Sequence, residues 1–166
     1  MEKKTWLIIG IGNELAGDDA LGRQVVESLA KKALPGVQIL SLPQLTPEMT
    51  EHLRCYEQVI FVDADVSGQE VALRPLASEG IRQPFSHLWS PQAILALLEM
   101  TTGSVPQAWL ATLPARDLGF GKSRNEFGAE LVAEAVRLIE VLIESQTATP
   151  RHLDEATRTV GSGTSK

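Results

Sequence analysis

Three groups of polar residues stand at places in this sequence where they could do chemistry. Asp18 and Asp19 follow the first apolar run, Asp63 and Asp65 follow a later one, and His87 precedes a segment that favours a helix. Carboxylates and imidazole are suitable ligands for nickel or zinc, which accept oxygen and nitrogen donors and can keep positions open for a substrate or water. These residues support a metal-site hypothesis, although ligands that folding brings together have no fixed spacing.

Each of these residues also has a structural interpretation. Adjacent aspartates at the start of a helix usually cap it and interact with its dipole, which applies to Asp18 and Asp19. Asp65 fits a turn, and His87 fits a surface position or a hydrogen-bonded position in the core. Asp63 differs, because a carboxylate directly after a buried apolar run stands at the carboxyl end of a strand, where α/β proteins place their sites.

Other chemistries find less support in the sequence. Cys55 is the only cysteine and has no histidine motif to activate it, so we expect a packed thiol, no internal disulfide and a reducing compartment. Two glycine-rich segments suggest nucleotide binding, but neither completes its motif. Leu15 stands where the dinucleotide motif beginning at Gly10 needs glycine or alanine, and Arg116 stands where a phosphate loop ending at Gly121-Lys122-Ser123 needs its first glycine.

Apolar runs between these groups predict the strands that would position them. We expect buried strands over residues 6–11 and 108–113, further strands over residues 37–42 and 58–62, and an exposed or edge strand over residues 70–74. Helical segments separate most of them. This alternation favours a mostly parallel sheet with helices on both faces, and its sites should collect at the carboxyl ends of the strands.

Amphipathic stripes and capping residues predict the helices. Leu21, Val25, Leu29 and Ala33 recur every four residues, and Pro35-Gly36 should stop that helix. Ser90 and Pro91 give an N-cap followed by proline at the first helical position. The other helices expected are a short one over residues 46–53, one from Pro91 through Met100, and a long final one with an inner face of Phe127, Leu131, Ala135, Leu138, Ile139 and Leu142.

Length and composition fit a single soluble domain. The 166 residues are 43% hydrophobic and 22% charged, enough for one continuous core. We assign the domain to residues 1–145 and a flexible tail to residues 146–166, which are rich in Thr, Ser, Arg and Gly. The net charge of −6 opposes nucleic-acid binding, and no apolar stretch approaches the roughly 20 residues that span a bilayer. We expect neither a nucleic-acid partner nor membrane insertion.

Four motifs, taken together, resemble the hydrogenase maturation endopeptidase family over roughly residues 6–143. They are Gly10-Ile11-Gly12-Asn13, Gly17-Asp18-Asp19-Ala20-Leu21-Gly22, Val62-Asp63-Ala64 and His87-Leu88-Trp89-Ser90-Pro91, in the family's order and spacing. The resemblance implies an α/β single-domain three-layer sandwich, with a twisted, mostly parallel five-stranded sheet and helices on both faces. The family removes a C-terminal extension from the nickel-loaded large-subunit precursor of a [NiFe] hydrogenase.

The resemblance also implies which residues act. Asp19 takes the first metal-ligand position of the family, Asp63 the second and His87 the third, while Asp18 keeps its capping role. The expected metal is nickel, presented by the precursor, and it could hold the cleavage segment in place. Ligand types leave open whether nickel also polarises the scissile carbonyl or activates water, and Asp63 is our preferred alternative as general base. We expect a cytoplasmic hydrolase that acts as a monomer.

Some alternatives remain open at the level of sequence. A noncatalytic nickel-binding assembly chaperone would use the same three ligands without cutting its partner. Leu42 to Pro47 replaces a Gly-Gly turn found in some family members, so substrate choice is expected to differ there. Gly119-Phe120-Gly121 could form a flap over the substrate tail or an ordinary glycine-permitted turn.

Overall fold

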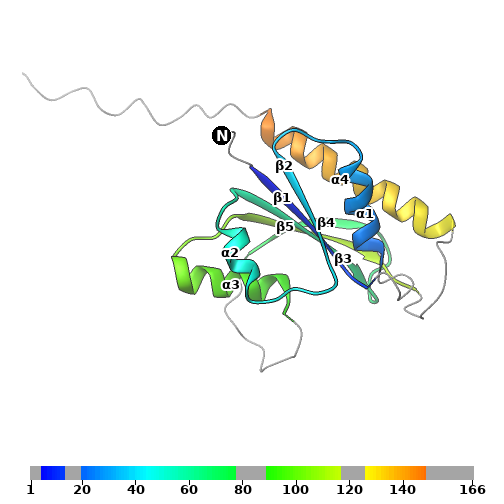
Figure 1. Cartoon of the computed structure of the whole chain (residues 1–166). Coiled ribbons are helices and arrows are strands. Elements are labelled where there is room, and N and C mark those ends of the chain that lie inside the picture. The colour runs from blue at the N-terminus through cyan, green and yellow to red at the C-terminus, as the bar shows by residue number, and fades with distance from the viewer. Residues whose placement is uncertain (1–4, 14–19, 78–88, 117–125, 149–166) are drawn as a thin grey trace, which may run out of the picture.

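The computed structural model describes residues 5–13, 20–77, 89–116 and 126–148. Strands and helices alternate through the first half of the chain, as the apolar runs predict (Figure 1). The elements of the described residues are β1 (Trp6–Ile11), α1 (Leu21–Ala30), β2 (Val37–Leu42), α2 (Met49–Leu53), β3 (Gln58–Asp65), β4 (Ala72–Leu76), α3 (Pro91–Thr102), β5 (Gln107–Pro114) and α4 (Glu126–Thr147).

The strands form one five-stranded sheet in the order β2-β1-β3-β5-β4. β1, β2, β3 and β5 run parallel, and β4 pairs antiparallel with β5 at one edge. All six residues of β1 are buried, as expected for a parallel strand covered on both faces. The predicted edge strand is confirmed two residues later than expected, and its Pro75 is tolerated because an edge strand can lack one hydrogen-bond donor.

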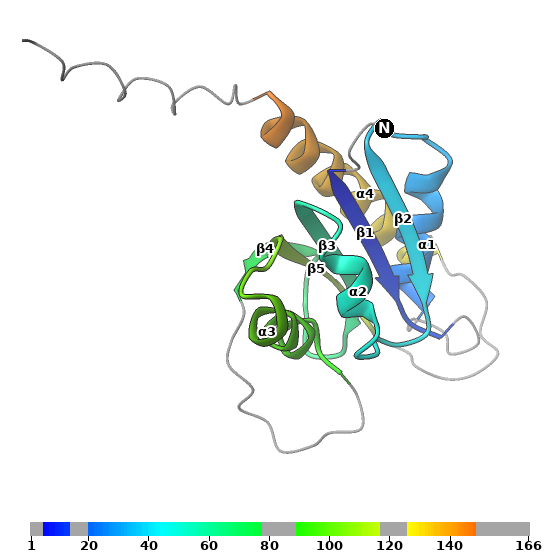
Figure 2. The same cartoon turned by 60° about the vertical axis from the view of Figure 1, so that its left-hand side comes forward.

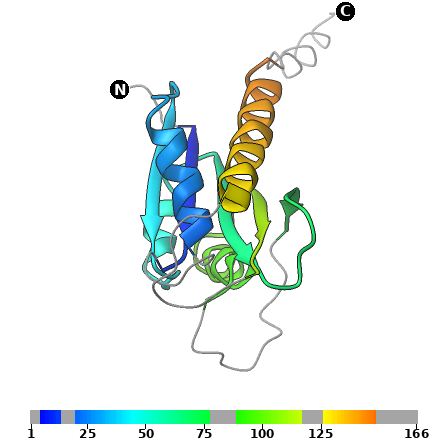
Figure 3. The same cartoon turned by 90° about the vertical axis from the view of Figure 1, so that its right-hand side faces the viewer.

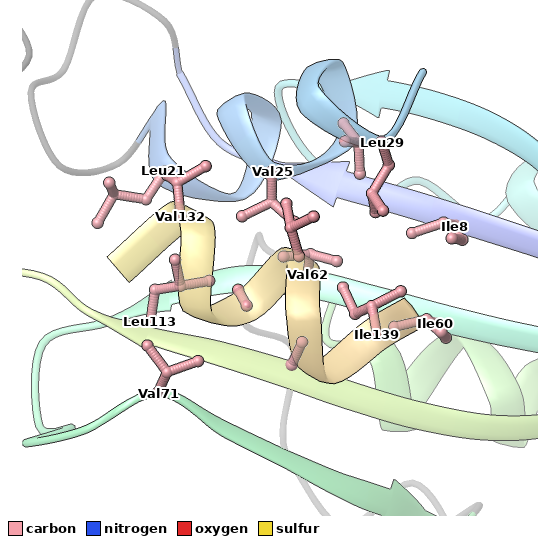
Figure 4. Close-up of a cluster of buried hydrophobic side chains, with 14 of the residues drawn as sticks. Ile8, Leu21, Val25, Leu29, Ile60, Val62, Val71, Leu113, Val132 and Ile139 are labelled. Atoms are coloured by element: carbon pink, nitrogen blue, oxygen red, sulfur yellow. The ribbon is translucent and has the colours of Figure 1, made fainter. Parts of the chain in front are cut away.

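Two pairs of helices cover the two faces of the sheet, which confirms the predicted three-layer sandwich. α1 and α4 lie over one face and α2 and α3 over the other (Figures 1 and 2). Under α1 and α4, Leu21, Val25 and Leu29 pack towards Val132 and Ile139 of α4 and the strands below (Figure 4). Burying apolar side chains on both faces supplies the main favourable free energy of such a fold.

The first helix ends earlier than its apolar stripe suggests. α1 ends at Ala30, so the expectation that Ala33 belongs to its inner face is wrong. Ala33 is exposed and adopts φ +48, in the left-handed region that ends helical geometry, while Leu34 packs against the core instead. Gly36, with φ +71, completes the turn into β2.

The later helices follow their predicted signals with shifted ends. The Oγ of Ser90 accepts a hydrogen bond from the backbone N of Ala93 at 3.1 Å, which confirms the N-cap of α3. α2 starts at Met49, three residues later than expected, because residues 47 and 48 form a turn. α4 runs to Thr147, two residues into the predicted tail, and residues 149–166 lie outside the described residues.

No helix in the described ranges is long and apolar enough to cross a membrane. α4 has 22 residues, but its exposed face carries charged side chains, including Glu130, Glu134 and Arg137. It covers the sheet beside α1 (Figure 3), and Glu140 Oε1 of α4 forms an ion pair at 2.8 Å with Nζ of Lys32, in the turn after α1.

Candidate active site at the carboxyl edge of the sheet

The carboxyl ends of β1 and β3 lie side by side in the middle of the sheet. Their pairing ends at Gly10 and Val62, and β3 continues alone on that side through Asp65. Asp63 therefore lies within β3 rather than after it, which corrects the predicted end of the strand at residue 62. The strand continues because Asp63 and Asp65 still pair with Thr112 and Pro114 of β5.

Asp63 is half-buried on the face of the sheet that α2 and α3 cover. Side chains alternate along a strand, and Val59 and Phe61, which precede Asp63 in the same row, belong to the core cluster under those helices. Asp63 Oδ1 accepts a hydrogen bond from the backbone N of Ala64 at 2.8 Å. Thr112, opposite on β5, is also half-buried. The Asp63 carboxylate thus continues a row of buried apolar side chains near the carboxyl end of β3.

Asp65 has a structural role, as predicted. Its Oδ1 accepts hydrogen bonds from the backbone N of Ser67 at 2.9 Å and from the Ser67 hydroxyl at 2.7 Å. These bonds to Ser67 hold the pKa of Asp65 below its ordinary value, since they favour the charged carboxylate. The Asp65 carbonyl also accepts a bond from the backbone N of Gly68, which closes the turn after β3, and one from the backbone N of Ala115, next to β5. The Asp65 carboxylate is committed to this turn.

The first turn of α1 approaches β1 and β3 at backbone distance. A Cβ on Gly22 would lie 2.5 Å from the carbonyl oxygen of Val62 and 2.7 Å from that of Ile11. A Cβ on Gly10 would lie 2.5 Å from the carbonyl oxygen of Gly22. These contacts leave no room for a side chain, so the glycines at both ends of the sequence motif let α1 start against the Val62-Asp63 peptide.

A hydrogen bond that sequence reasoning missed fixes the same turn to the neighbouring strand. The Nε of Arg23, in the first turn of α1, donates to the Oγ of Ser41 near the carboxyl end of β2 at 2.7 Å. A polar residue in an otherwise apolar strand was the signal available in the sequence. Thr112 of β5 gives the same kind of signal opposite Asp63.

The start of α3 is also attached to the face that carries Asp63. Trp89 is half-buried and packs against the apolar cluster under α2 and α3. Ser90 then caps the helix, and Pro91 is buried at its first position. The chain therefore enters α3 on the side of the sheet to which the side chain of Asp63 belongs.

Two of the three predicted ligands, Asp19 and His87, lie outside the described residues, as does Asp18. Within the described ranges, no three His, Cys, Asp or Glu side chains gather as they would around a metal ion. The N-cap position of α1 is Ala20, already in helical geometry at φ −79 and ψ −6, so the capping role of the aspartates stays a prediction. The proposed flap, residues 119–121, also lies outside.

Cys55 and His52 show no arrangement for nucleophilic catalysis in the described part of the chain. The expectation of a packed thiol is wrong, because Cys55 is exposed at the end of α2 and donates to the Glu51 carbonyl oxygen at 3.6 Å. Cys55 lies two residues beyond the last residue of α2. His52 is exposed on the same helix, as expected.

No family model matches this chain, and no curated protein matches it by sequence. Solved structures do match it. The hydrogenase maturating endopeptidase HybD from E. coli aligns with a TM-score of 0.68 and 20% identity, over 86% of this chain and 93% of that one. The [NiFe] hydrogenase maturation protease HycI from Thermococcus kodakarensis aligns with a TM-score of 0.64 and 23% identity, over 86% and 92%.

A hydrogenase 2 maturation peptidase from a Thaumarchaeota archaeon aligns with a TM-score of 0.63 and 25% identity, over 84% of this chain and 97% of that one. The match spans nearly the whole length of each of these proteins. At such identities the likeness is one of fold, and it confirms the fold that the motif resemblance implied.

Proposed function

We propose that this chain is a hydrogenase maturation endopeptidase, which removes the C-terminal extension of a nickel-loaded [NiFe] hydrogenase large-subunit precursor. The observation that carries the proposal is the coincidence of two independent features. The chain matches solved maturation proteases over nearly their whole length. Asp63 lies near the carboxyl end of β3, the central strand of the sheet. Fold alone would not support an activity, so the site residues must carry it.

The attachment of α1 supports a role for Asp19 beside Asp63. Asp19 precedes Gly22 by three residues, so their Cα atoms lie within about 11 Å, the extended length of that segment. Gly22 itself is packed against the carbonyl of Val62, the residue before Asp63. The covalent chain thus limits how far Asp19 can lie from the Val62-Asp63 peptide, which supports the proposal.

His87 is tethered in a similar way. It precedes Trp89 by two residues, which limits the distance between their Cα atoms to about 7 Å. Trp89 packs on the face of the sheet to which the row of Asp63 belongs. A ligand set of Asp19, Asp63 and His87 is therefore compatible with the fold, and its mixed oxygen and nitrogen donors suit nickel.

In this proposal nickel arrives with the substrate. The precursor presents the ion, and the three side chains complete its coordination and position the segment to be cut. Hydrolysis adds water across one peptide bond, which requires a group to accept a proton from that water. Asp63 is the candidate for this base, because it lies near the carboxyl end of the central strand of the sheet. The proposed reaction takes place in the cytoplasm.

The mass of the precursor tests the proposal and separates it from a nickel carrier. The purified chain is incubated with the nickel-loaded large-subunit precursor, and intact masses are measured over time. A protease shortens the precursor by its C-terminal extension, whereas a noncatalytic chaperone leaves its polypeptide mass unchanged. If the precursor keeps its mass but nickel is transferred, the chain is a nickel carrier and not a protease.

A further inference from the structure

The two edges of the sheet are protected to different degrees. β4, at one edge, carries the exposed residues Arg74 and Pro75. β2, at the other, has the sequence Val-Gln-Ile-Leu-Ser-Leu, with neither charge nor proline, and all its residues are half-buried. Natural edge strands usually carry charges, proline or bulges that prevent pairing with another strand. Within the described residues, β2 lacks these features and no strand pairs with its outer side (Figure 2).

The hydrogen-bond ladder shows which groups of β2 face outward. The backbone N of Gly12 donates to the carbonyl oxygen of Leu42, so Leu42 directs its backbone groups towards β1. In a parallel ladder this direction alternates by residue, and Ile39 and Ser41 therefore direct theirs away from the sheet. The Gln38 Nε2 donates to the carbonyl oxygen of Ile39 at a long 3.4 Å. An added strand would replace this weak bond easily.

The side chains of β2 define the chemistry that fits beside it. Val37 and Ile39 pack towards α1 and α4, and Leu40 and Leu42 pack towards α2 and α3. A strand placed against β2 would extend both of these apolar rows. The best complement is an extended, uncharged segment that carries apolar side chains on both of its faces.

We propose that the outer edge of β2 docks an extended, uncharged segment of the large-subunit precursor as a sixth strand of the sheet. This inference rests on the proposed function and adds the binding mode. It commits to the precursor because β2 leads to the site. The carboxyl end of β2 is bonded to Gly12, and its Ser41 is bonded to Arg23 in the α1 turn that touches the Val62-Asp63 peptide.

The sheet spacing predicts how far the docked segment lies from the cut. A strand on β2 would stand three strand spacings from β3, or about 14 Å. Crossing the ends of β2 and β1 at that distance takes about four extended residues. The docked segment and the scissile bond should therefore be separated by at least about four residues of the precursor.

Ser41→Pro tests the docking edge, with Ser41→Ala as its matched control. Both variants lose the hydroxyl that accepts from Arg23, but only proline removes the outward N–H and places a ring on the docking side. Relative to Ser41→Ala, we expect Ser41→Pro to raise the KM for the precursor about tenfold, the effect of roughly one lost main-chain hydrogen bond, with little change in kcat. Thermal melting of both variants reports on folding.

Hydrogen exchange of the wild-type amides tests the same edge without any substitution. In the full chain alone, the Ile39 and Ser41 amides should exchange faster than those of Leu40 and Leu42. Adding a synthetic peptide of the precursor's last 25 residues should slow Ile39 and Ser41 selectively. Equal KM values for both variants would overturn the docking mode. So would the absence of protection by a peptide or precursor that is nevertheless cleaved. Neither result would contradict the proposed protease activity.

Two further outcomes would contradict the docking of the precursor on β2 or the proposed function itself. A dimer of the wild-type chain in sedimentation that Ser41→Pro converts to a monomer would assign the edge to a second copy, against this inference. Failure of the wild type to shorten the nickel-loaded precursor would reject the proposed function itself, and the docking of a substrate would fall with it.

Discussion

Asp63 and Asp65 belong to the same strand and the same row of side chains, yet their surroundings differ. Asp65 accepts two hydrogen bonds from Ser67 and closes a turn at the surface. Asp63 follows the buried row of Val59 and Phe61 and lies beside the backbone that α1 touches through Gly22. The two carboxylates at the end of one strand therefore differ in their hydrogen bonds and in the backbone beside them.

The comparison shows why residue type alone could not separate the two roles. Either aspartate could end a strand or bind a metal. The difference comes from the local donors of Ser67, which bond to Oδ1 of Asp65, and from the helix that starts beside Asp63. Substitutions that affect one region and spare the other test this separation.

The largest effect is expected for Asp63→Asn, with Asp65→Asn as the matched control. Loss of a carboxylate that acts as base or ligand should slow precursor processing by about 100-fold or more, while Asp65→Asn should process at nearly the wild-type rate. Asp19→Ala and His87→Ala should resemble Asp63→Asn. Intact mass over time gives the rates, and equal slowing by both asparagine variants would remove the distinction.

The next effect concerns the glycines beside each aspartate. Gly22→Ala places a methyl group 2.5 Å from the Val62 carbonyl oxygen and should lower the free energy of unfolding by about 2 to 3 kcal/mol. At Gly68, beside Asp65, the nearest atom would lie 3.4 Å away, an ordinary contact. Gly68→Ala should change stability by about 0.5 kcal/mol or less.

Urea unfolding of both glycine variants measures this difference. The reason lies in what the methyl group meets, which is backbone at Gly22 and a side chain of the surface turn at Gly68. If Gly22→Ala were as stable as the wild type, the close approach of α1 to β3 would not be a constraint on the site.

The fold followed from the sequence where burial and local signals agree. β1 and β2 have the predicted bounds, and the Ser90 cap starts α3 as expected, because mostly apolar runs and a capping hydroxyl act locally. β3 was predicted too short because its last residues are polar, while pairing with β5 holds them in the strand. Ala33 fitted a helical repeat, but the chain turns after Ala30.

The site was predictable only in part. Asp63 stood out by its position after an apolar run, and the structure places it at the expected edge. The contact of Gly22 with Val62 and the bond from Arg23 to Ser41 join residues far apart in the sequence. A polar residue in β2 could mark Ser41, but no local pattern could identify its partner. The roles of Asp19 and His87 stay predictions.

A smaller effect is expected from the titration of Asp65. Its pKa lies below the ordinary value of 3.8 because Ser67 bonds to the charged form. Its contribution to stability is therefore present above the unfolded pKa and is lost as the pH falls through the lower folded pKa. Carbon-detected NMR should find the pKa of Asp65 raised in Ser67→Ala, and an unchanged pKa would contradict the role of this turn.

The smallest effect is expected from removal of the C-terminal residues. Removing residues 149–166 leaves α4 and its inner residues, including Ile139 and Ile143, intact. Melting temperature and processing rate should both stay close to those of the full chain. Unchanged melting with abolished processing would instead assign the tail to recognition of the precursor.

The most direct test of the account compares nickel-loaded and nickel-free precursors, each incubated with the wild type and with Asp63→Asn. Intact mass spectrometry records the loss of the C-terminal extension. We expect a shortened product only for the wild type with the nickel-loaded precursor. Cleavage that is independent of nickel, or a variant as active as the wild type, would contradict the assignment of Asp63 to a nickel-directed protease site.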